Sequence, residues 1–155
     1  MQADATPAAF EPQNSAGYWI NRASRLLLRL HEARLRPLGF GMSNLPVLIA
    51  LEDGGALAQK ELAQLARVEQ PTMAEMLSRM ERDGIVERAP NPNDKRASLT
   101  SLSRRSRARL PKAKEALMQG EREAMTGLSK AEKEQLLGLL RRVVGNLEET
   151  IEPGE

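Results

Sequence analysis

Two segments in the middle of the chain carry apolar residues at helical spacing. They span about residues 58–66 and 71–83, and Gly84 follows the second. Their apolar residues are Leu62, Leu65 and Ala66 in the first segment and Met73, Met76, Leu77 and Met80 in the second. A four-residue connection, residues 67–70, separates the two segments. The pattern therefore predicts two short helices that cross steeply.

After the second helix the pattern changes to that of strands. Ile85 and Val86 favour a pleated strand, and residues 97–102 suit a return strand. Between them, Pro90 and Pro92 fix φ and lack a backbone N–H, so we expect residues 91–93 to turn rather than pair. A helix, a turn, a second helix and then a hairpin follow one another in a winged helix-turn-helix.

Both ends of the chain carry helical patterns with more apolar surface than one core-facing stripe needs. The upstream helix holds Trp19, Ile20, Ala23, Leu26, Leu27 and Leu30; the downstream helix holds Leu136, Leu137, Leu139, Leu140, Val143, Val144 and Leu147. Ser129 and Glu132 form a capping-box pattern that opens the downstream helix. A third helix follows the hairpin and contains Pro111, which should kink it or mark its first turns. The surplus apolar surface indicates a partner; the alternative is a monomer whose terminal helices complete the core.

The charge is unevenly distributed. The whole chain carries a net charge of +2, but residues 88–114 hold nine Lys or Arg and one acid, Asp94. The remaining chain has 14 basic and 20 acidic residues. A basic segment at a predicted hairpin suits a polyanion such as DNA. The alternative is a solvated, Arg-rich helix face.

The order and spacing of several short motifs can now be compared with a known family. Thr72 is followed by Arg79-Met80-Glu81-Arg82-Asp83-Gly84-Ile85-Val86-Glu87-Arg88 and then by Asn91-Pro92-Asn93-Asp94-Lys95-Arg96. This series resembles the MarR family of bacterial transcription regulators, and the likeness extends over about residues 17–150. The resemblance implies a mainly α fold: a winged helix-turn-helix with a small β-hairpin wing and N- and C-terminal dimerisation helices. The expected parts are a flexible N-terminal tail (residues 1–14), a helical dimerisation region (residues 15–36 and 104–150) and a DNA-binding region (residues 42–103).

A helix of about a dozen residues fits the major groove, and the residues near its N-terminus reach deepest. The base-facing candidates are Gln70, Pro71, Thr72, Met73 and Glu75, with Arg79 further along the same helix. Gln70 could pair with adenine, and Thr72 could contact a phosphate or a thymine methyl group. Met73 also belongs to the apolar stripe, so its alternative place is in the core. Glu75 either faces phosphates unfavourably or accepts a hydrogen bond from a cytosine amino group, and the sequence leaves its direction open.

The expected wing contacts are different in kind. Arg96, near the tip, is expected to enter a narrow minor groove, where negative potential favours Arg. The family resemblance implies that Asp94 orients the Arg96 guanidinium; the alternative is that Asp94 only forms the turn. Arg88 and Lys95 are expected to contact phosphates.

The resemblance further implies a homodimer, which would bind a pseudo-palindromic operator with half-sites about 10 base pairs apart. The residues expected to form the dimer are Trp19, Ile20, Leu136, Leu140, Val143, Val144 and Leu147. The resemblance also implies a small aromatic or phenolic effector. The residues chosen by position to line its site are Trp19, His31, Arg34, Phe40 and Met42. The alternative for His31 is an exposed or capped helix residue.

Several functional classes are disfavoured. The chain has no Cys and one His, a poor set for oxidant sensing or for a transition metal. We find no Gly-rich phosphate loop and no nucleophile paired with the His, so we expect neither an enzyme nor a cofactor. No apolar run is long enough to cross a bilayer and no secretory signal begins the chain, so we expect a cytoplasmic protein. We therefore predict a ligand-responsive DNA-binding repressor. The alternative is a dimeric protein-interaction module that has lost specific DNA binding.

Overall fold

The computed structural model describes residues 11–151, which divide into two compact units. Unit 1 extends to Gly120 and unit 2 begins at Glu121. Residues 1–10 of the expected N-terminal tail lie outside the described residues. The rest of that tail is structured, because Pro12–Asn14 form a 3-10 turn whose Gln13 carbonyl accepts a hydrogen bond from Trp19 Nε1 at 2.9 Å.

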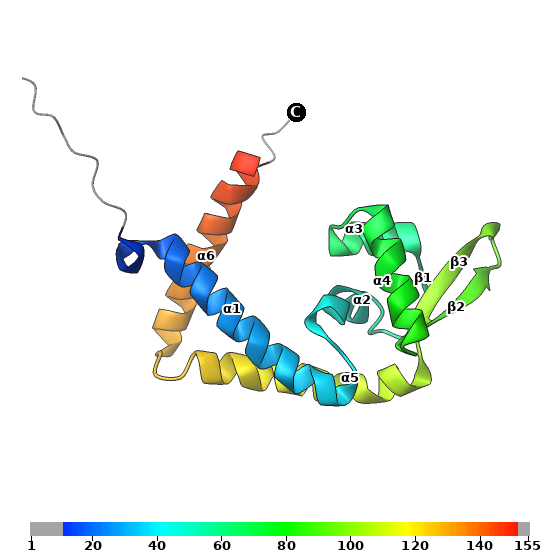
Figure 1. The fold of residues 1–155 in the computed structure, drawn as a ribbon, viewed down its shortest axis with the longest axis horizontal. Coiled ribbons are helices and arrows are strands. Elements are labelled where there is room, and N and C mark those ends of the chain that lie inside the picture. Colours follow the sequence, from blue (N-terminus) through cyan, green and yellow to red (C-terminus); the bar gives the residue numbers. More distant parts are fainter. Residues whose placement is uncertain (1–10, 152–155) are drawn as a thin grey trace, which may run out of the picture. The chain divides into compact units, whose positions relative to one another are not determined.

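Unit 1 holds most of the elements labelled in Figure 1. In chain order they are η1 (Pro12–Asn14), α1 (Ala16–Leu35), η2 (Arg36–Leu38), η3 (Met42–Asn44), α2 (Leu45–Ala50), β1 (Leu57–Ala58), α3 (Gln59–Ala66), α4 (Gln70–Arg82), β2 (Val86–Asn91), β3 (Asp94–Leu102) and α5 (Arg104–Ala124), whose last residues belong to unit 2. The predicted order of helix, turn, helix and hairpin is confirmed by α3, α4, β2 and β3. The fold is the mainly α winged helix-turn-helix that the sequence predicts.

The sheet has three strands in the order β1-β3-β2, all antiparallel. The sequence pattern missed β1, which has only two residues, and Leu57 of this strand pairs with Thr100 of β3. Because β2 lies at an edge, it tolerates Pro90 within the strand. Asn91 pairs with Asp94, so the turn contains only residues 92–93 and is shorter than the expected 91–93.

The core of unit 1 lies between the short helices and the sheet. Its fully or almost fully buried large side chains are Leu35, Val47, Leu48, Leu51, Leu62, Met73, Leu77, Met80, Val86, Thr100 and Leu102. The apolar stripe predicted for the second helix is confirmed by Met73, Leu77 and Met80. In α3 the prediction was partly wrong, because Leu65 is 63% exposed and Ala63 is buried instead. A helix of two turns has too few residues for its spacing to identify the inward face, so packing of the neighbouring elements decides it.

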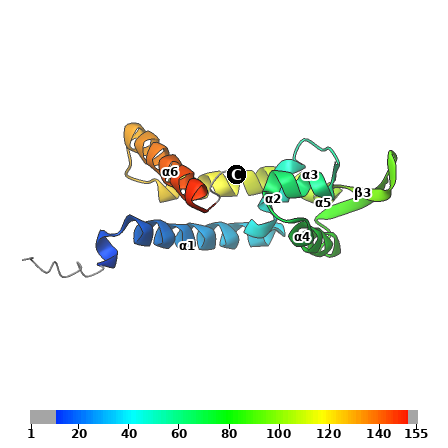
Figure 2. The same cartoon turned by 90° about the horizontal axis from the view of Figure 1, so that it is seen from above.

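Within unit 1, α5 runs beside α1, as seen from above in Figure 2. A glycine permits the close approach. A Cβ atom on Gly120 would lie 2.7 Å from His31 Nε2, so α1 or α5 would have to shift to admit it. His31 is consequently buried, with 8% of its surface exposed, so the alternative of an exposed helix residue was wrong. The sequence pattern showed His31 on α1 but did not show that a glycine from α5 would cover it.

Unit 2 contains the end of α5 and helix α6 (Lys130–Ile151). The capping box predicted at the start of α6 is confirmed: the Ser129 N–H donates to Glu132 Oε2 at 2.7 Å, and the Glu132 N–H donates to Ser129 Oγ at 3.2 Å. The hydrogen bond from the Ser129 backbone holds the pKa of the Glu132 carboxyl below its ordinary value, and the Ser129 side chain acts in the same direction. Among the helices of residues 11–151, none is both long and apolar enough to span a bilayer.

Candidate nucleic-acid interface

Helix α4 has a buried face and an exposed face. Met73, Leu77 and Met80 are all fully buried. The predicted DNA-contacting residues that lie on the exposed face are Gln70, Pro71, Thr72, Glu75 and Arg79. The place of Met73 among the base-facing residues was therefore wrong, because its side chain is closed off from any ligand by the core. Helical periodicity explains this, since Met73 shares the stripe of Leu77 and Met80.

The start of α4 is defined by an extended residue, Glu69, which is its N-cap at φ −64° and ψ 149°. The Met73 N–H donates to the Glu69 carbonyl at 3.0 Å, so the helix begins at Gln70, one residue before the predicted start. Pro71 stands in the first turn, where a missing N–H leaves no helical hydrogen bond unmade. The exposed residues at positions 70–72 thus occupy the end of the helix that reaches furthest into a groove.

The turn between α3 and α4 contains an unusual backbone conformation. Among the described non-glycine residues, Arg67 alone has a positive φ, with φ 52° and ψ 47°. The Val68 N–H donates to the Ala63 carbonyl at 3.0 Å, which closes the end of α3. A side chain in the left-handed region costs about 1–2 kcal/mol, so this turn stores strain at the point that sets the approach of α4 to α3.

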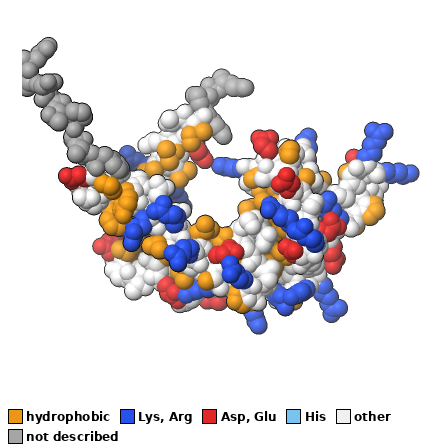
Figure 3. Space-filling model, viewed as in Figure 1, with side chains coloured by type: hydrophobic (Ala, Val, Ile, Leu, Met, Phe, Trp, Pro, Cys, Tyr) orange, Lys and Arg blue, Asp and Glu red, His pale blue; other side chains and the backbone are white. Residues whose placement is uncertain are grey.

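Two side-chain hydrogen bonds to the backbone shape the tip of the wing. Asn91 Oδ1 accepts from the Asn93 N–H at 2.9 Å, and Asp94 Oδ1 accepts from the Arg96 N–H at 2.9 Å. The contact made by Asp94 is thus with the Arg96 backbone rather than with its guanidinium, which favours the turn-forming alternative. The tip residues Lys95 and Arg96 are exposed, and Figure 3 shows basic side chains projecting there.

Several cations of the basic segment 88–114 are used inside the protein. Arg88 Nε lies 3.3 Å from Glu81 Oε2, and Arg107 Nη2 donates to the Leu102 carbonyl at 3.0 Å. Farther along α5, Arg109 donates to the Leu38 carbonyl and Lys114 pairs with Glu52. Arg107 and Lys114 remain exposed although they make these contacts, and the other exposed cations of the segment are Lys95, Arg96, Arg104, Arg105 and Lys112. Arg88 was expected to contact a phosphate, whereas here it joins β2 to the end of α4.

Ser103, which was not among the residues predicted from the sequence, joins three elements. Its hydroxyl donates to the Gly84 carbonyl at 2.8 Å, at the end of α4, and accepts from the Ser106 N–H at 3.2 Å, in the first turn of α5. The Ser103 N–H donates to the Ile85 carbonyl at 3.0 Å. A Ser directly before a helix is an N-cap signal, so this residue could have been found.

The five residues proposed to line an effector site do not form one pocket. Phe40 is buried in the core, and Trp19 is 53% exposed near the start of α1. His31 and Arg34 lie at Gly120, twelve or more residues along α1 from Trp19, which is about 18 Å of helix. The Met42 N–H donates to Glu32 Oε2 at 2.8 Å, which places η3 beside α1. Within residues 11–151 no group of three His, Asp or Glu residues could hold a metal ion.

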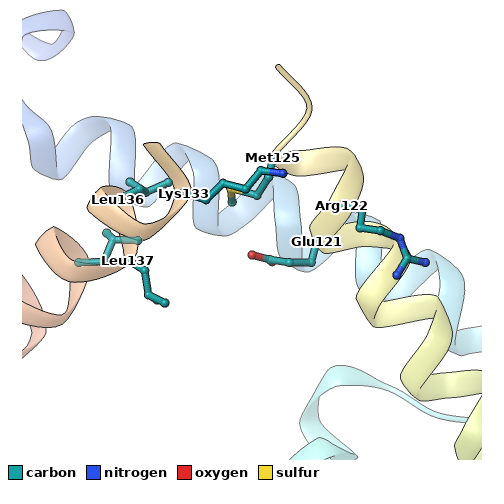
Figure 4. A pocket seen from close by; sticks show the side chains of 7 residues that line it. Glu121, Arg122, Met125, Lys133, Leu136 and Leu137 are labelled. Atoms are coloured by element: carbon teal, nitrogen blue, oxygen red, sulfur yellow. The ribbon is translucent and has the colours of Figure 1, made fainter. Parts of the chain in front are cut away.

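Unit 2 has a largely apolar pocket of its own between the end of α5 and α6, with a volume of about 280 Å³ (Figure 4). Its lining residues are Glu121, Arg122, Met125, Lys133, Leu136, Leu137 and Leu140. Leu136 and Leu140 belong to the predicted dimerisation set, as do the exposed residues Val143, Val144 and Leu147. Trp19 and Ile20, the members of that set in unit 1, are also exposed.

Comparison with known proteins agrees with this architecture. A family model described as "MarR family" matches residues 42–98, which contain α2, α3, α4 and most of the wing. The chain is 29% identical over 122 residues to YwoH of Bacillus subtilis, an uncharacterized HTH-type transcriptional regulator, covering 79% of this chain and 88% of that protein. It is 33% identical over 86 residues to the multiple antibiotic resistance protein MarR of Salmonella typhimurium, covering 56% of this chain and 58% of that protein.

A solved structure extends the likeness over most of the chain. A mutant MarR from E. coli, crystallised in complex with operator DNA, superposes with a TM-score of 0.72 and 28% identity. The superposition covers 82% of this chain and 91% of the E. coli chain. The family match, the related regulators and the winged helix-turn-helix with an exposed α4 face and a cationic wing tip lead to one conclusion. Residues 42–98 of this chain match the MarR family, and the chain is a DNA-binding transcription regulator.

Proposed function

We propose that the chain is a homodimeric repressor that binds a pseudo-palindromic operator and is released by a small aromatic or phenolic effector. Because the proposed target is chromosomal DNA, we place this activity in the cytoplasm. The observation that supports the proposal most strongly is the combination of an exposed face on the first half of α4 with an exposed pair of cations, Lys95 and Arg96, at the wing tip. These two surfaces match the two ways in which proteins hold duplex DNA: base contacts that specify and backbone contacts that position.

Each surface has a separate role in this proposal. Gln70 and Thr72 contact base edges in the major groove, Pro71 approaches the groove beside them, and Arg79 contacts a phosphate or a base farther along the helix. Arg96 enters the adjacent minor groove, where a narrow A·T-rich stretch concentrates negative potential. Lys95 contacts a phosphate and positions the wing without specifying sequence.

The dimer is proposed from apolar side chains that unit 1 and unit 2 each leave exposed. Residues 15–36 and 104–150 form the dimerisation region in this proposal, and residues 42–103 bind DNA. The exposed apolar residues in the two terminal helices include Trp19, Leu26, Leu28, Leu137, Leu139, Val144 and Leu147. A second copy that covers them removes this surface from water, and its two-fold axis places the two α4 helices one DNA turn apart, about 34 Å.

The effector is proposed to act where His31 is buried between α1 and α5. His31 Nε2 is buried and has no hydrogen-bond partner among the described residues, and Arg34 lies beside the same glycine, Gly120. An aromatic acid or phenol supplies an oxygen that can form a hydrogen bond with His31 Nε2. Met42 and Trp19 are secondary candidates, and Phe40 is a core residue. A ligand shifts the DNA-binding equilibrium only by its different affinity for the two arrangements of the dimer.

One experiment tests operator binding. Duplexes are selected from a random pool by the full chain, and the enriched sequence is measured by fluorescence anisotropy across about 50 to 300 mM salt. We expect a two-fold symmetric motif, half-sites about 10 base pairs apart, and an affinity that falls steeply with salt. Light scattering on the same sample should give the mass of a dimer. Failure to enrich any motif would overturn operator binding and favour a dimeric protein-interaction module.

The effector needs a separate measurement. Benzoate and phenol are added to the full chain, and the melting temperature and the operator affinity are recorded. A rise in melting temperature with a loss of operator affinity, both reduced in His31→Phe, supports the proposed site. Retention of both effects in His31→Phe would place the effector elsewhere.

A further inference from the structure

Glu75 lies on the outward side of α4, opposite its buried face. Successive residues of an α-helix are rotated by about 100° about the helix axis. Glu75 is two residues from Met73 and two from Leu77, a rotation of about 200°, so it lies on nearly the opposite side of the helix from both. Both of those residues are fully buried. Glu75 therefore points directly away from the core, which answers the question of direction that the sequence left open. It is the sixth residue of a 13-residue helix, within the half that enters a groove.

The Glu75 carboxylate has no partner in the described part of the chain. It forms no hydrogen bond or ion pair there, although Arg79 stands four residues later, at the spacing that suits a Glu-to-Arg pair on a helix. Glu75 is thus free to interact with whatever α4 contacts. On DNA the nearest charges of the same sign are phosphates, so an outward acid in this position opposes binding unless a donor meets it.

The major groove offers two amino donors, N4 of cytosine and N6 of adenine. A carboxylate only accepts hydrogen bonds. Next to the adenine N6 amino group lies N7, which is also an acceptor and repels a carboxylate, whereas the cytosine amino group has no acceptor of its own beside it in this groove. The chemistry of an ionised Glu therefore selects cytosine.

We propose that Glu75 accepts a hydrogen bond from the N4 amino group of a cytosine, and that this contact determines one C·G base pair in each half-site of the operator. The inference rests on the operator binding proposed above and adds a specificity-determining residue to it. With guanine or thymine at that position the carboxylate meets no donor, and with adenine it also faces the acceptor N7. The site therefore loses affinity because the wrong base is repelled as well as because a hydrogen bond is missing. Glu75 thus adds selectivity while lowering the affinity for DNA in general.

The test compares the motifs selected by the wild-type chain and by Glu75→Gln. The wild-type motif should contain cytosine at one position of each half-site. Glu75→Gln should replace this preference by adenine at the same position, because an amide pairs with both N6 and N7 of adenine. The expected change in the ratio of affinities for the two bases is about 5- to 150-fold, with the rest of the motif unchanged.

A matched control is Glu87→Gln, which removes the same charge from an exposed residue of β2. We expect it to tighten binding to all sequences slightly and to leave the motif unchanged. Thermal melting should show that both variants are folded, since both side chains are exposed. If Glu75→Gln tightens binding to every sequence equally and keeps the wild-type motif, Glu75 only repels phosphates and the inference is overturned while operator binding stands. If the wild-type chain enriches no motif, operator binding itself fails and the inference fails with it.

Discussion

Helix α4 and the wing tip are both exposed, but they are held in place differently. The inner face of α4 carries Met73, Leu77 and Met80, three fully buried side chains that join the helix to the core. The tip of the wing has no buried side chain from Glu87 to Arg96 and is held by strand pairing and by two side-chain hydrogen bonds to its own backbone. Geometry at α4 is therefore fixed by packing, whereas geometry at the wing is fixed locally.

The charges of the two regions differ as well. The exposed face of α4 mixes acids and bases, with Glu75 among Arg79 and Arg82, while the wing tip exposes Lys95 and Arg96. A rigid surface of mixed charge suits the reading of bases, and a locally formed cationic loop suits attraction to a polyanion. Sequence preference and salt-dependent affinity should therefore be separable by mutation in this protein.

The largest expected effect is on stability, from the inner face of α4. Met73→Ala should lower the free energy of unfolding by about 2–5 kcal/mol, because it removes a fully buried side chain and leaves a cavity. Urea denaturation at a fixed protein concentration measures this. Thr72→Ala, one residue away on the exposed face, is the control and should change stability by less than about 0.5 kcal/mol. Equal losses from the two variants would contradict the division of α4 into a packed face and a reading face.

The next effect is on DNA affinity, from the wing. Arg96→Ala should weaken operator binding about tenfold or more and reduce the salt slope by about one, with no loss of stability, since the side chain is exposed. Fluorescence anisotropy at several salt concentrations measures both quantities. Lys112→Ala removes the same charge from an exposed position on α5 and should change affinity by less than about twofold. Wild-type affinity in Arg96→Ala would show that the wing tip does not grip DNA.

A smaller effect comes from the ion pair that joins the two regions. Arg88 on β2 and Glu81 on α4 lie 3.3 Å apart, and the Arg88 side chain is 25% exposed. A double-mutant cycle with Arg88→Ala and Glu81→Ala should give a coupling energy of about 0.5–1 kcal/mol in unfolding, because solvent screens a partly exposed pair. In Arg88→Ala the salt dependence of operator binding should stay unchanged. A coupling energy of zero, together with a salt slope lowered by about one in Arg88→Ala, would instead make Arg88 a phosphate contact, as the sequence predicts.

The smallest effect concerns the turn that sets the approach of α4. Arg67→Gly should raise the free energy of unfolding by about 0.5 kcal/mol, because glycine adopts the left-handed conformation without strain. The greater conformational freedom of glycine in the unfolded chain offsets part of this gain. Thermal or urea unfolding measures the change. Arg79→Gly, in the middle of α4, is the opposite control and should destabilise by about 1 kcal/mol. A loss of stability in Arg67→Gly would show that the contacts of the Arg67 side chain outweigh the backbone strain.

The parts of the fold that repeat over several turns were predictable from the sequence. The stripe of α4 and the capping box of Ser129 and Glu132 are local patterns, and both are confirmed. Predictions failed for short elements, whose few residues show no clear periodicity. The two-residue strand β1 was missed, and the inward face of α3 was assigned to Leu65, which is exposed.

For the candidate site, the sequence determined which residue types stand at the start of α4 and at the wing tip, because helix period, proline and turn chemistry act between near neighbours. Tertiary structure decided which of those side chains remain available. It buried Met73, engaged Arg88 with Glu81, covered His31 with Gly120 and turned Glu75 outward. Each of these outcomes depends on a surface supplied by another element or on the packing of the opposite face. Local periodicity carries no information about which distant residue will supply that surface.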